Sequence, residues 1–471
     1  MTDDHAMPAA ENGANDNQRR GKALKLAAVT AIASKLGSVV LQLVAVPVAI
    51  GVLGKEQYGV YATVLIFYAL LQLAECGLLG SLSRRLTIAA AAHDKDGEHS
   101  ILYTGVILIA LLGTLGIAIL YGVLSQVSLL TIVGQNFAGY ESDIYHSIGF
   151  AAVISLLYLI TYNFAAARFA YQEAHIYNLW GALGNISGGV LLIAGIHTFP
   201  SVPYVIVSVL GAPVISQTCN AIHLLIQRPY LRFSMKRMQG GYFKTLWKEG
   251  LSLQIAQNLS VIGHQEGGKI ILGHLFGPVA VALFAALMQI RVFLTNLVLV
   301  VTMPLWPSIT EAKEKGDVAW IRLSRKRASL AVIAFVMCTA AGLTVAGPFA
   351  ADLWLRGEIA ISHVQFAAFA LYFGLLMWVH VQFVLLTGSG SIYRPAVLMV
   401  GETLLAVSLG YAGAQMGGET GLFIGLAISI ACVSAWSFPF LLSRQIKEVE
   451  ESFAPPVPDE RRRVEEHALP G

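Results

Sequence analysis

Long apolar segments recur along almost the whole chain and are separated by short polar stretches. A membrane-spanning helix needs about 20 mostly apolar residues. Twelve segments meet this requirement: 25–53, 57–82, 99–124, 144–165, 175–197, 201–226, 249–274, 278–304, 327–350, 360–387, 394–416 and 418–443. The pattern therefore predicts an all-α polytopic membrane protein with twelve transmembrane helices and no separate soluble domain.

Polar sequence borders these helices in three places. Residues 1–22 and 447–471 are charged or contain proline, and we expect both to be disordered tails. Residues 227–248 alternate basic with aromatic and aliphatic side chains, and they divide the helices into an N-terminal lobe (23–226) and a C-terminal lobe (249–446). We expect this linker to lie on anionic lipid headgroups, although a specific partner site stays open.

The positions of Lys and Arg indicate how the helices are oriented. Most basic residues fall in the tails, the linker and alternate loops, whereas the intervening loops hold only Lys55 and Arg356. Cytoplasmic loops carry the excess of Lys and Arg, so both termini are expected in the cytoplasm. Only 13% of the residues are charged, against about 25% in a soluble protein, which agrees with a multi-pass membrane protein.

A weak internal repeat relates the two halves. When the chain is shifted by 223 residues, segment 52–65 overlies segment 275–288, and Gly54 then meets Gly277 while Tyr61 meets Phe284. Both segments join the first two helices of their half. Because each half has six helices and starts on the same side, the sequence predicts lobes related by a pseudo-two-fold axis along the membrane normal.

Three basic side chains, Lys35, Lys269 and Arg291, lie inside the apolar segments. A cation in hydrocarbon costs at least ~2.5–3.5 kcal/mol on insertion scales, so such residues face a protein interior or a water-filled cavity. Arg291 is near mid-span, Lys269 is three residues from Glu266, and Lys35 could instead snorkel to the surface. The three cations predict a cavity lined with positive charge.

Amides accompany these cations at helical spacing. In segment 249–274, Gln254, Asn258 and Gln265 cluster on the same face as Lys269, and His264 flanks them. In the first predicted helix, Gln42 shares a face with Lys35. These residues are predicted to form a polar cavity lining.

Three acidic residues also lie within predicted helices. Glu75, Glu266 and Glu402 each need a proton, a cation or a basic partner in the membrane, and each could carry a coupling H⁺ or Na⁺. Arg84 and Arg85 end the second predicted helix at the inner surface, where they could anchor the helix or capture an anionic headgroup. We expect no cofactor, no metal and no nucleic-acid partner. The chain has no P-loop, HExxH or GxSxG motif, and an enzyme is not expected.

Several stretches resemble Wzx-type polysaccharide flippases, which belong to the superfamily that also contains multidrug-efflux and peptidoglycan-precursor exporters. The resemblance rests on LGKEQYGVYATVL and the residues after it (53–86), on PLWPSITEAKEKGDVAWIR (304–322) and on LLTGSGSIYRPAVLMVGETLLAVSL (385–409). With the helix count, it covers about residues 25–445. Glu75 stands where relatives often have Asp, which preserves the charge.

The resemblance implies a transporter of the bacterial cytoplasmic (inner) membrane. Its cargo would be an oligosaccharide on a polyprenyl pyrophosphate, moved to the periplasmic leaflet by alternating access for O-antigen, capsule or exopolysaccharide synthesis. A polysaccharide polymerase and chain-length machinery are possible partners. Arg291, Lys269 and Lys35, with Arg84 and Arg85 at the mouth, are the candidate ligands for the pyrophosphate.

Two other interpretations remain at this stage. A cation-coupled multidrug antiporter has the same fold but needs an acidic and aromatic pocket, so the sign of the open cavity distinguishes the two. A lipid scramblase or non-transporting assembly subunit would tolerate neutral residues at positions 269 and 291.

The cationic-cavity interpretation predicts that Arg291→Ala or Lys269→Ala abolishes export of surface polysaccharide while the protein level is unchanged. The measurement is surface polysaccharide per cell, with membrane protein quantified by immunoblot. Normal export in both variants would contradict it.

Overall fold

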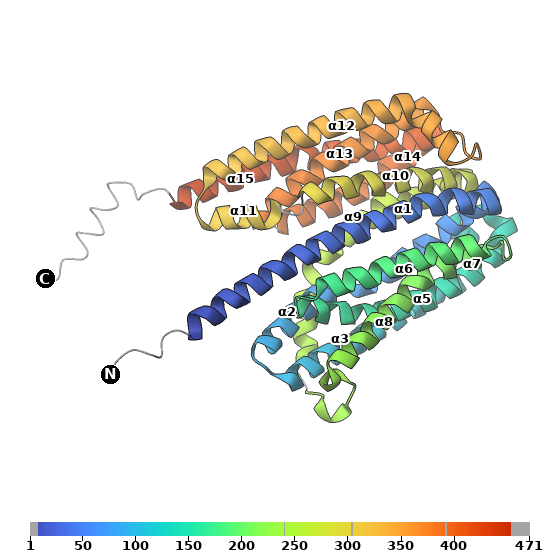
Figure 1. Ribbon diagram of the computed structural model, residues 1–471. Coiled ribbons are helices and arrows are strands. Elements are labelled where there is room, and N and C mark those ends of the chain that lie inside the picture. Colours follow the sequence, from blue (N-terminus) through green and yellow to red (C-terminus); the bar gives the residue numbers. More distant parts are fainter. Residues whose placement is uncertain (1–7, 240, 303–304, 391–392, 454–471) are drawn as a thin grey trace, which may run out of the picture.

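The computed structural model describes residues 8–239, 241–302, 305–390 and 393–453, and helices without strands make up this part of the chain (Figure 1). Nine helical stretches in it are long and apolar enough to cross a membrane. Two of these, Gly37–Ala91 and Tyr393–Phe453, are long enough for two crossings each. The predicted all-α, two-lobed membrane architecture is confirmed.

The N-terminal half contains eight α-helices and a π-helical turn. Their bounds are α1 (Pro8–Gln72), α2 (Leu78–Ala91), α3 (Lys95–Gln126), α4 (Leu129–Val133), α5 (Glu141–Ala170), α6 (Ala174–Gly195), α7 (Val202–Ile206) and α8 (Ala212–Gln227), with the turn η3 (Val207–Gly211) between the last two. Short 3-10 turns lie at η1 (Leu73–Glu75) and η2 (Gln135–Tyr140) in this half, and at η4 (Pro229–Leu231) and η5 (Met235–Arg237) in the linker.

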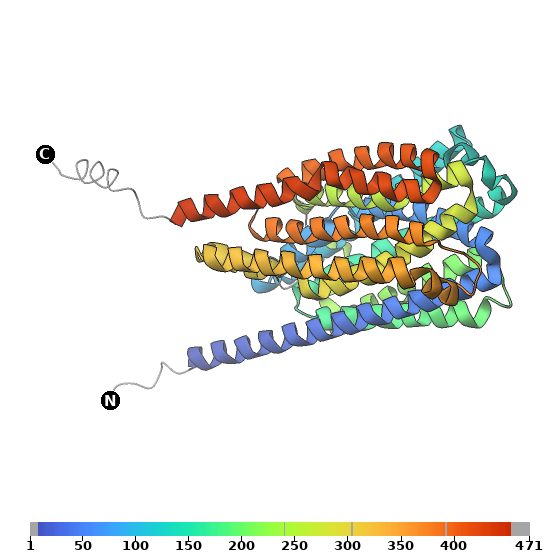
Figure 2. The ribbon, with the colours of Figure 1, turned by 90° about the horizontal axis from the view of Figure 1, so that it is seen from above.

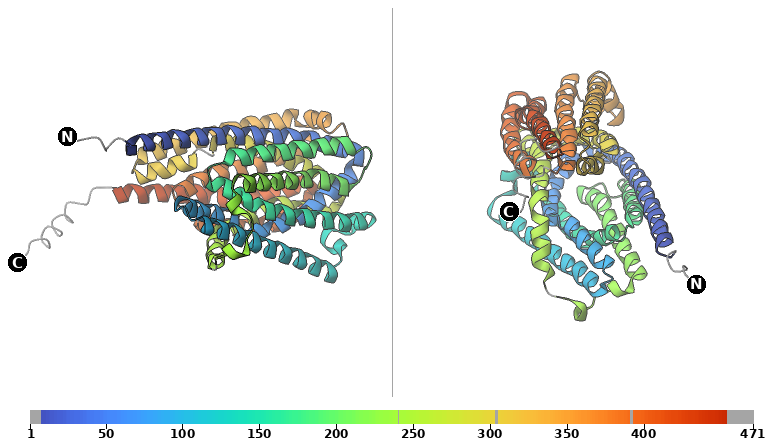
Figure 3. Two further views of the ribbon diagram at one scale, coloured as in Figure 1. Left: turned by 60° about the horizontal axis from the view of Figure 1, so that its bottom comes forward. Right: turned by 90° about the vertical axis from the view of Figure 1, so that its left-hand side faces the viewer.

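The C-terminal half consists of longer helices. They are α9 (Tyr242–Phe276), α10 (Pro278–Thr302), α11 (Leu305–Glu314), α12 (Val318–Trp354), α13 (His363–Gly388), α14 (Tyr393–Cys432) and α15 (Ser434–Phe453). An end-on view shows α12–α15 grouped on one side of the molecule and the helices of the N-terminal half on the other (Figure 3). The core continues across both groups, because buried residues of α1, α5, α9, α10, α13 and α14 form a single cluster.

Several helix boundaries differ from those predicted. Helix α1 includes the first predicted crossing and most of the second, and Gly54 makes the turn between them with φ 79°. The second crossing, predicted to be continuous over 57–82, is interrupted at η1, after which Cys76 and Gly77 both have positive φ. The last crossing is also interrupted, between the end of α14 at Cys432 and the start of α15 at Ser434. Hydrophobicity alone does not record such backbone breaks.

Helix also replaces part of each tail that was predicted to be disordered. Helix α1 begins at Pro8, and α15 continues to Phe453. The end of α15 is stabilised by an ion pair between Arg444 and Glu448 and by another from Glu450 to Arg322 of α12. Both described ends of the chain lie at the same end of the molecule (Figures 1 and 2).

The two halves touch closely at the end opposite the termini. A Cβ atom on Gly59 of α1 would lie 1.9 Å from the carbonyl oxygen of Pro278, at the start of α10, so the two backbones are in direct contact. Nearby, a Cβ atom on Gly277 would lie 2.9 Å from Asn136. The indole of Trp354 donates to the Leu43 carbonyl oxygen at 2.6 Å, which joins α12 to α1. The halves are therefore joined at this end.

The linker between the halves packs on protein at the other end. Tyr103 of α3 donates to the Leu231 carbonyl oxygen at 2.9 Å, and Arg228 pairs with Glu173 at 2.7 Å. Burial would raise the pKa of Glu173, but hydrogen bonds from Arg228 and Arg168 hold it below its usual value. Phe233 and Met235 nevertheless stay exposed beside these basic residues, so the predicted contact with anionic lipids is still a prediction.

Glycines determine how closely the two arms of α14 pack around its kink at Gly417 and Gly418. A Cβ atom on Gly425 would lie 2.2 Å from the Leu409 carbonyl oxygen, whereas one on Gly401 of the same helix would meet nothing within 4 Å. We expect Gly425→Ala to destabilise the protein by about 1–3 kcal/mol through overpacking, and the control Gly401→Ala to be neutral or slightly stabilising. Thermal unfolding in detergent tests this, and equal midpoints would contradict the packing.

Candidate functional site

A polar-lined cavity of about 880 Å³ lies within the C-terminal half. Helices α9, α10, α11, α13, α14 and α15 all contribute to it. Most of its wall is aliphatic or aromatic. The polar residues are His264, Gln265, Arg291, Thr295, Asn296, Thr302, His380, Glu402 and Ser434. The cavity is thus an apolar chamber with one full positive and one full negative charge.

The negative charge, Glu402, is buried and already has partners. One of its carboxylate oxygens lies 3.2 Å from His264 Nε2, and the other accepts the Ser434 backbone N–H at 3.2 Å. Ser434 is the first residue of α15, so Glu402 satisfies an amide that the helix interruption leaves free. The imidazole of His264 in turn stacks on Tyr372, with ring centroids 6.1 Å apart.

The positive charge, Arg291, is less well satisfied. In the part of the chain that the structure describes, no carboxylate pairs with Arg291, and its buried Nε has no hydrogen-bond partner. The hydroxyl of Tyr372 approaches the guanidinium of Arg291 closely enough for a weak hydrogen bond, although the geometry is not that of a normal one. An unpaired cation is costly in so apolar a chamber, and an anion in the cavity would remove that cost.

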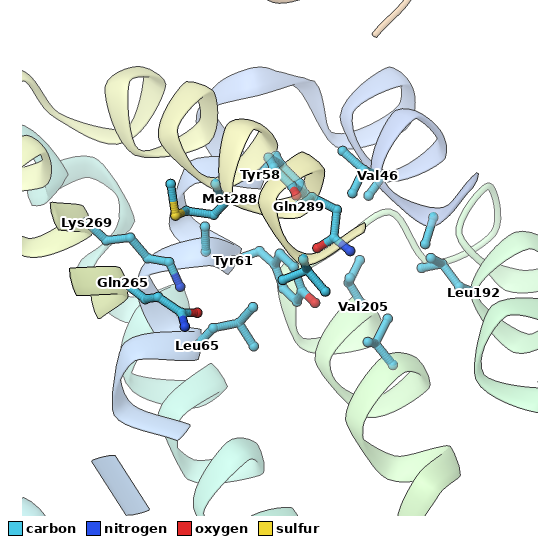
Figure 4. A pocket seen from close by; sticks show the side chains of 16 residues that line it. Val46, Tyr58, Tyr61, Leu65, Leu192, Val205, Gln265, Lys269, Met288 and Gln289 are labelled. Carbon is cyan, nitrogen blue, oxygen red and sulfur yellow. The ribbon is translucent and has the colours of Figure 1, made fainter. Parts of the chain in front are cut away.

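Lys269 lies elsewhere, in a cavity of about 160 Å³ between the two halves. Its ammonium donates to Glu266 at 2.8 Å, and both side chains are buried. Figure 4 shows Lys269 beside Gln265, opposite Tyr61 and Leu65 from the second arm of α1. Gln265 lines both cavities, so it connects the lobe interface with the chamber of Arg291.

The predicted polar face on the first helix is only partly described. Lys35 is half-buried and interacts with another residue. Its neighbour Ser38 accepts a hydrogen bond from Asn185 of α6 at 2.5 Å. The side chains of Gln42, Gln254 and Asn258 lie outside the described residues. The structure thus places Arg291 and Lys269 in different cavities, and neither of these two cavities includes Lys35.

Glu75 lies at the interruption of the second crossing. Its carboxylate accepts the backbone N–H of Leu79 at 3.0 Å and that of Gly77 at 3.3 Å, so it caps the N-terminus of α2. Half-buried tyrosines from α5 and α6 surround it, and Tyr158 and Tyr162 stack at 5.4 Å. Farther along α2, Arg84 is exposed and Arg85 is half-buried. No group of three possible metal ligands occurs among the described residues.

Some residues in and around the chamber were not singled out from the sequence. Tyr372 contacts His264 and lies near Arg291, and Ser434 binds Glu402 through its backbone. His380 faces the chamber and lies 3.2 Å from the Thr302 hydroxyl. Tyr372 and His380 are eight residues apart on α13, a spacing that puts two residues on similar faces of a helix, so a search for polar residues at helical spacing could have found the pair.

Comparison with known proteins identifies the fold. No family model matches the chain, and no curated protein matches it. An inward-facing multidrug resistance MATE family transporter of the MOP superfamily aligns with a TM-score of 0.72 at 17% identity, over 91% of this chain and 100% of that one. An outward-facing structure described in the same words gives 0.63 at 17% identity, over 92% and 97%. A eukaryotic MATE transporter gives 0.63 at 13% identity, over 92% and 99%. The chain therefore has a MATE-like, two-lobed transporter fold.

The Lys269–Glu266 pair allows a stability prediction. Lys269→Met leaves Glu266 buried without a partner, which should destabilise the protein by about 3–5 kcal/mol. The unchanged protein level expected from the sequence for Lys269→Ala is corrected accordingly, because that variant also removes the partner of Glu266. Adding Glu266→Gln to Lys269→Met removes the unpaired charge and should restore most of the loss. Thermal unfolding of the purified variants is the measurement. A stable Lys269→Met protein, or a double variant no better than the single one, would show that the pair does not matter for folding.

Proposed function

We propose that this protein is an alternating-access exporter of an oligosaccharide linked to a polyprenyl pyrophosphate, with the anionic headgroup bound at Arg291. The MATE-like fold supports a transporter, and the polar chamber of the C-terminal half supplies a place for the cargo. The single observation that carries the choice of cargo is the difference between the two charged residues of that chamber. Glu402 already has hydrogen-bond partners, and Arg291 has an unpartnered Nε.

In the chamber, Glu402 has hydrogen-bond partners on both carboxylate oxygens, whereas Arg291 has no carboxylate partner among the described residues. Glu402 has a histidine and a backbone amide as partners, so a cationic solute would have to displace at least one of them. Arg291 has an unpartnered Nε and faces the same space. A guanidinium binds phosphate oxygens in a two-pronged geometry, and such charge-assisted hydrogen bonds are about twice as strong as neutral ones. The chamber is therefore better prepared for an anion.

We retain only Arg291 of the three deep cations as a ligand for the headgroup. Lys269 is neutralised by Glu266 at the lobe interface, and Lys35 lies on α1 in the other half. The proposal accordingly relies on Arg291 for charge. Gln265, Asn296 and Thr295 are the hydrogen-bonding groups beside it.

The arrangement of the halves supports access from the end that carries the termini. The lobes are joined by backbone contact at the opposite end, where Gly59 meets Pro278. The TM-score is also higher with the inward-facing MATE transporter than with the outward-facing one. Export would then require the Gly59–Pro278 contact to open while the other end closes.

The energy for export could come from the membrane potential and from a coupling ion. An elementary charge moved across 100 mV corresponds to about 2.3 kcal/mol. Glu75 and the His264–Glu402 pair are the proposed positions for H⁺ or Na⁺, because neither carboxylate has a Lys or Arg partner among the described residues, whereas Glu266 is paired with the Lys269 ammonium.

A second candidate is a cation-coupled multidrug antiporter. Two of the structural neighbours named above favour it, since they are described as multidrug resistance transporters. The largely apolar walls of the chamber and the carboxylate of Glu402 would suit an amphipathic cation once His264 or Ser434 is displaced.

Variants of the two chamber charges separate these candidates. For the lipid-linked cargo, Arg291→Ala should lower surface polysaccharide at least about tenfold, since a charged hydrogen bond is worth about 1.5–3 kcal/mol, and Arg291→Lys should retain part of the activity. The exposed cation Arg394 provides the control Arg394→Ala, which should export normally.

The same strains should be tested for resistance to cationic dyes. The proposed function predicts no change of resistance in Arg291→Ala or in Glu402→Gln. Normal polysaccharide export by Arg291→Ala, together with loss of dye resistance in Glu402→Gln, would reject the flippase and establish the antiporter.

A further inference from the structure

An apolar groove opens on the outer face of the C-terminal half. It has a volume of about 540 Å³ and lies between α12 and α13, with Ala435 of α15 at its base. Ile333, Met337 and Leu371 line it and are 47–65% exposed, so the groove faces the surroundings of the helix bundle. Only 11% of the most apolar window of α12 is buried inside the protein. For a membrane-spanning helix, the groove therefore faces the lipid bilayer.

A small cavity lies between the groove and the chamber of Arg291 and borders both. This cavity, of about 120 Å³, shares Val332 with the groove and Thr302 with the chamber. The three spaces therefore follow one another from the lipid-facing surface, between α10, α12 and α13, to the polar interior. Phe335 and Val381 line the middle space.

The lining chemistry changes along this path in a single direction. At the groove, Thr344 and Trp378 are the polar-capable residues, and the Trp378 indole is already bonded to the Ala435 carbonyl oxygen at 2.8 Å. At the far end, the chamber holds Arg291 with an unpartnered Nε. A molecule with a long apolar chain and an anionic head matches both ends at once.

We propose that the α12–α13 groove binds the isoprenoid chain of a lipid-linked cargo whose headgroup lies at Arg291. The inference rests on the proposed function and specifies where the chain leaves the protein. The small side chains of Ala340 and Ala370 line the groove and leave room for the methyl branches of such a chain, whereas an ordinary bilayer lipid would contact many lipid-facing helices alike.

The test uses the full chain in nanodiscs with a polyprenyl phosphate that carries a diazirine in its chain, followed by peptide mapping of the label. We expect label on α12 and α13 near Met337 and Leu371. Ala340→Trp fills the groove and should reduce this labelling at least about tenfold. The loss of contact for only two methylene groups of the isoprenoid chain already corresponds to a tenfold loss of binding. Ala334→Trp is the matched control, because Ala334 is exposed on α12 but does not line the groove.

Three results would overturn the inference. Two are equal labelling in both tryptophan variants and label spread over all lipid-facing helices. The third is that a diazirine phosphatidylcholine labels the groove equally well and that unlabelled polyprenyl phosphate does not reduce this labelling. These outcomes are independent of the proposed function. If the groove is labelled but Arg291→Ala exports polysaccharide normally, the groove still binds an isoprenoid chain and the proposed cargo is wrong. If the label is diffuse but Arg291→Ala loses export, the proposed cargo stands and the groove is not its binding site.

Discussion

The cost of burying charge in a membrane protein governs the interior of this structure. Each deep charge must have a partner, bind an ion or face a solute, since an isolated charge loses its hydration without compensation. Lys269 and Glu266 satisfy each other, Glu402 is held by His264 and an amide, and Glu75 is held by two amides. Arg291 is the deep charge to which the described residues supply no carboxylate, and its Nε has no hydrogen-bond partner. For this reason, the proposed anion site lies in the chamber that Arg291 lines.

Glu75, which is half-buried, and Glu402, which is buried, perform the same structural task. Glu75 caps α2 after the interruption at Cys76 and Gly77, and Glu402 bonds the first amide of α15. A helix that is interrupted inside a membrane leaves backbone groups without partners, and a carboxylate at that point compensates them. The polar character of these positions therefore has a structural cause. A coupling role for either acid would act through the capped helix as well as through the bound ion.

Much of the architecture could be predicted from the sequence, and the reasons are physical. The length and apolar composition of the crossings determine the all-α class, and the three-residue spacing of Glu266 and Lys269 already indicates their pair. The His264–Glu402 contact could not be predicted, because 138 residues separate the two and only the packing of α9 on α14 joins them. Arg291 and Lys269 were expected to share a cavity. They face different spaces because each space is formed by a different set of neighbouring helices, which a single sequence does not reveal.

The central claim is that an anionic headgroup compensates Arg291 inside the C-terminal half. An experimental structure of the full chain determined with polyprenyl pyrophosphate tests it most directly. The account predicts pyrophosphate density in the chamber, within hydrogen-bonding distance of the Arg291 guanidinium, with Glu402 still bonded to His264. Headgroup density at Lys35 or near α2, with the chamber of Arg291 empty, would contradict it.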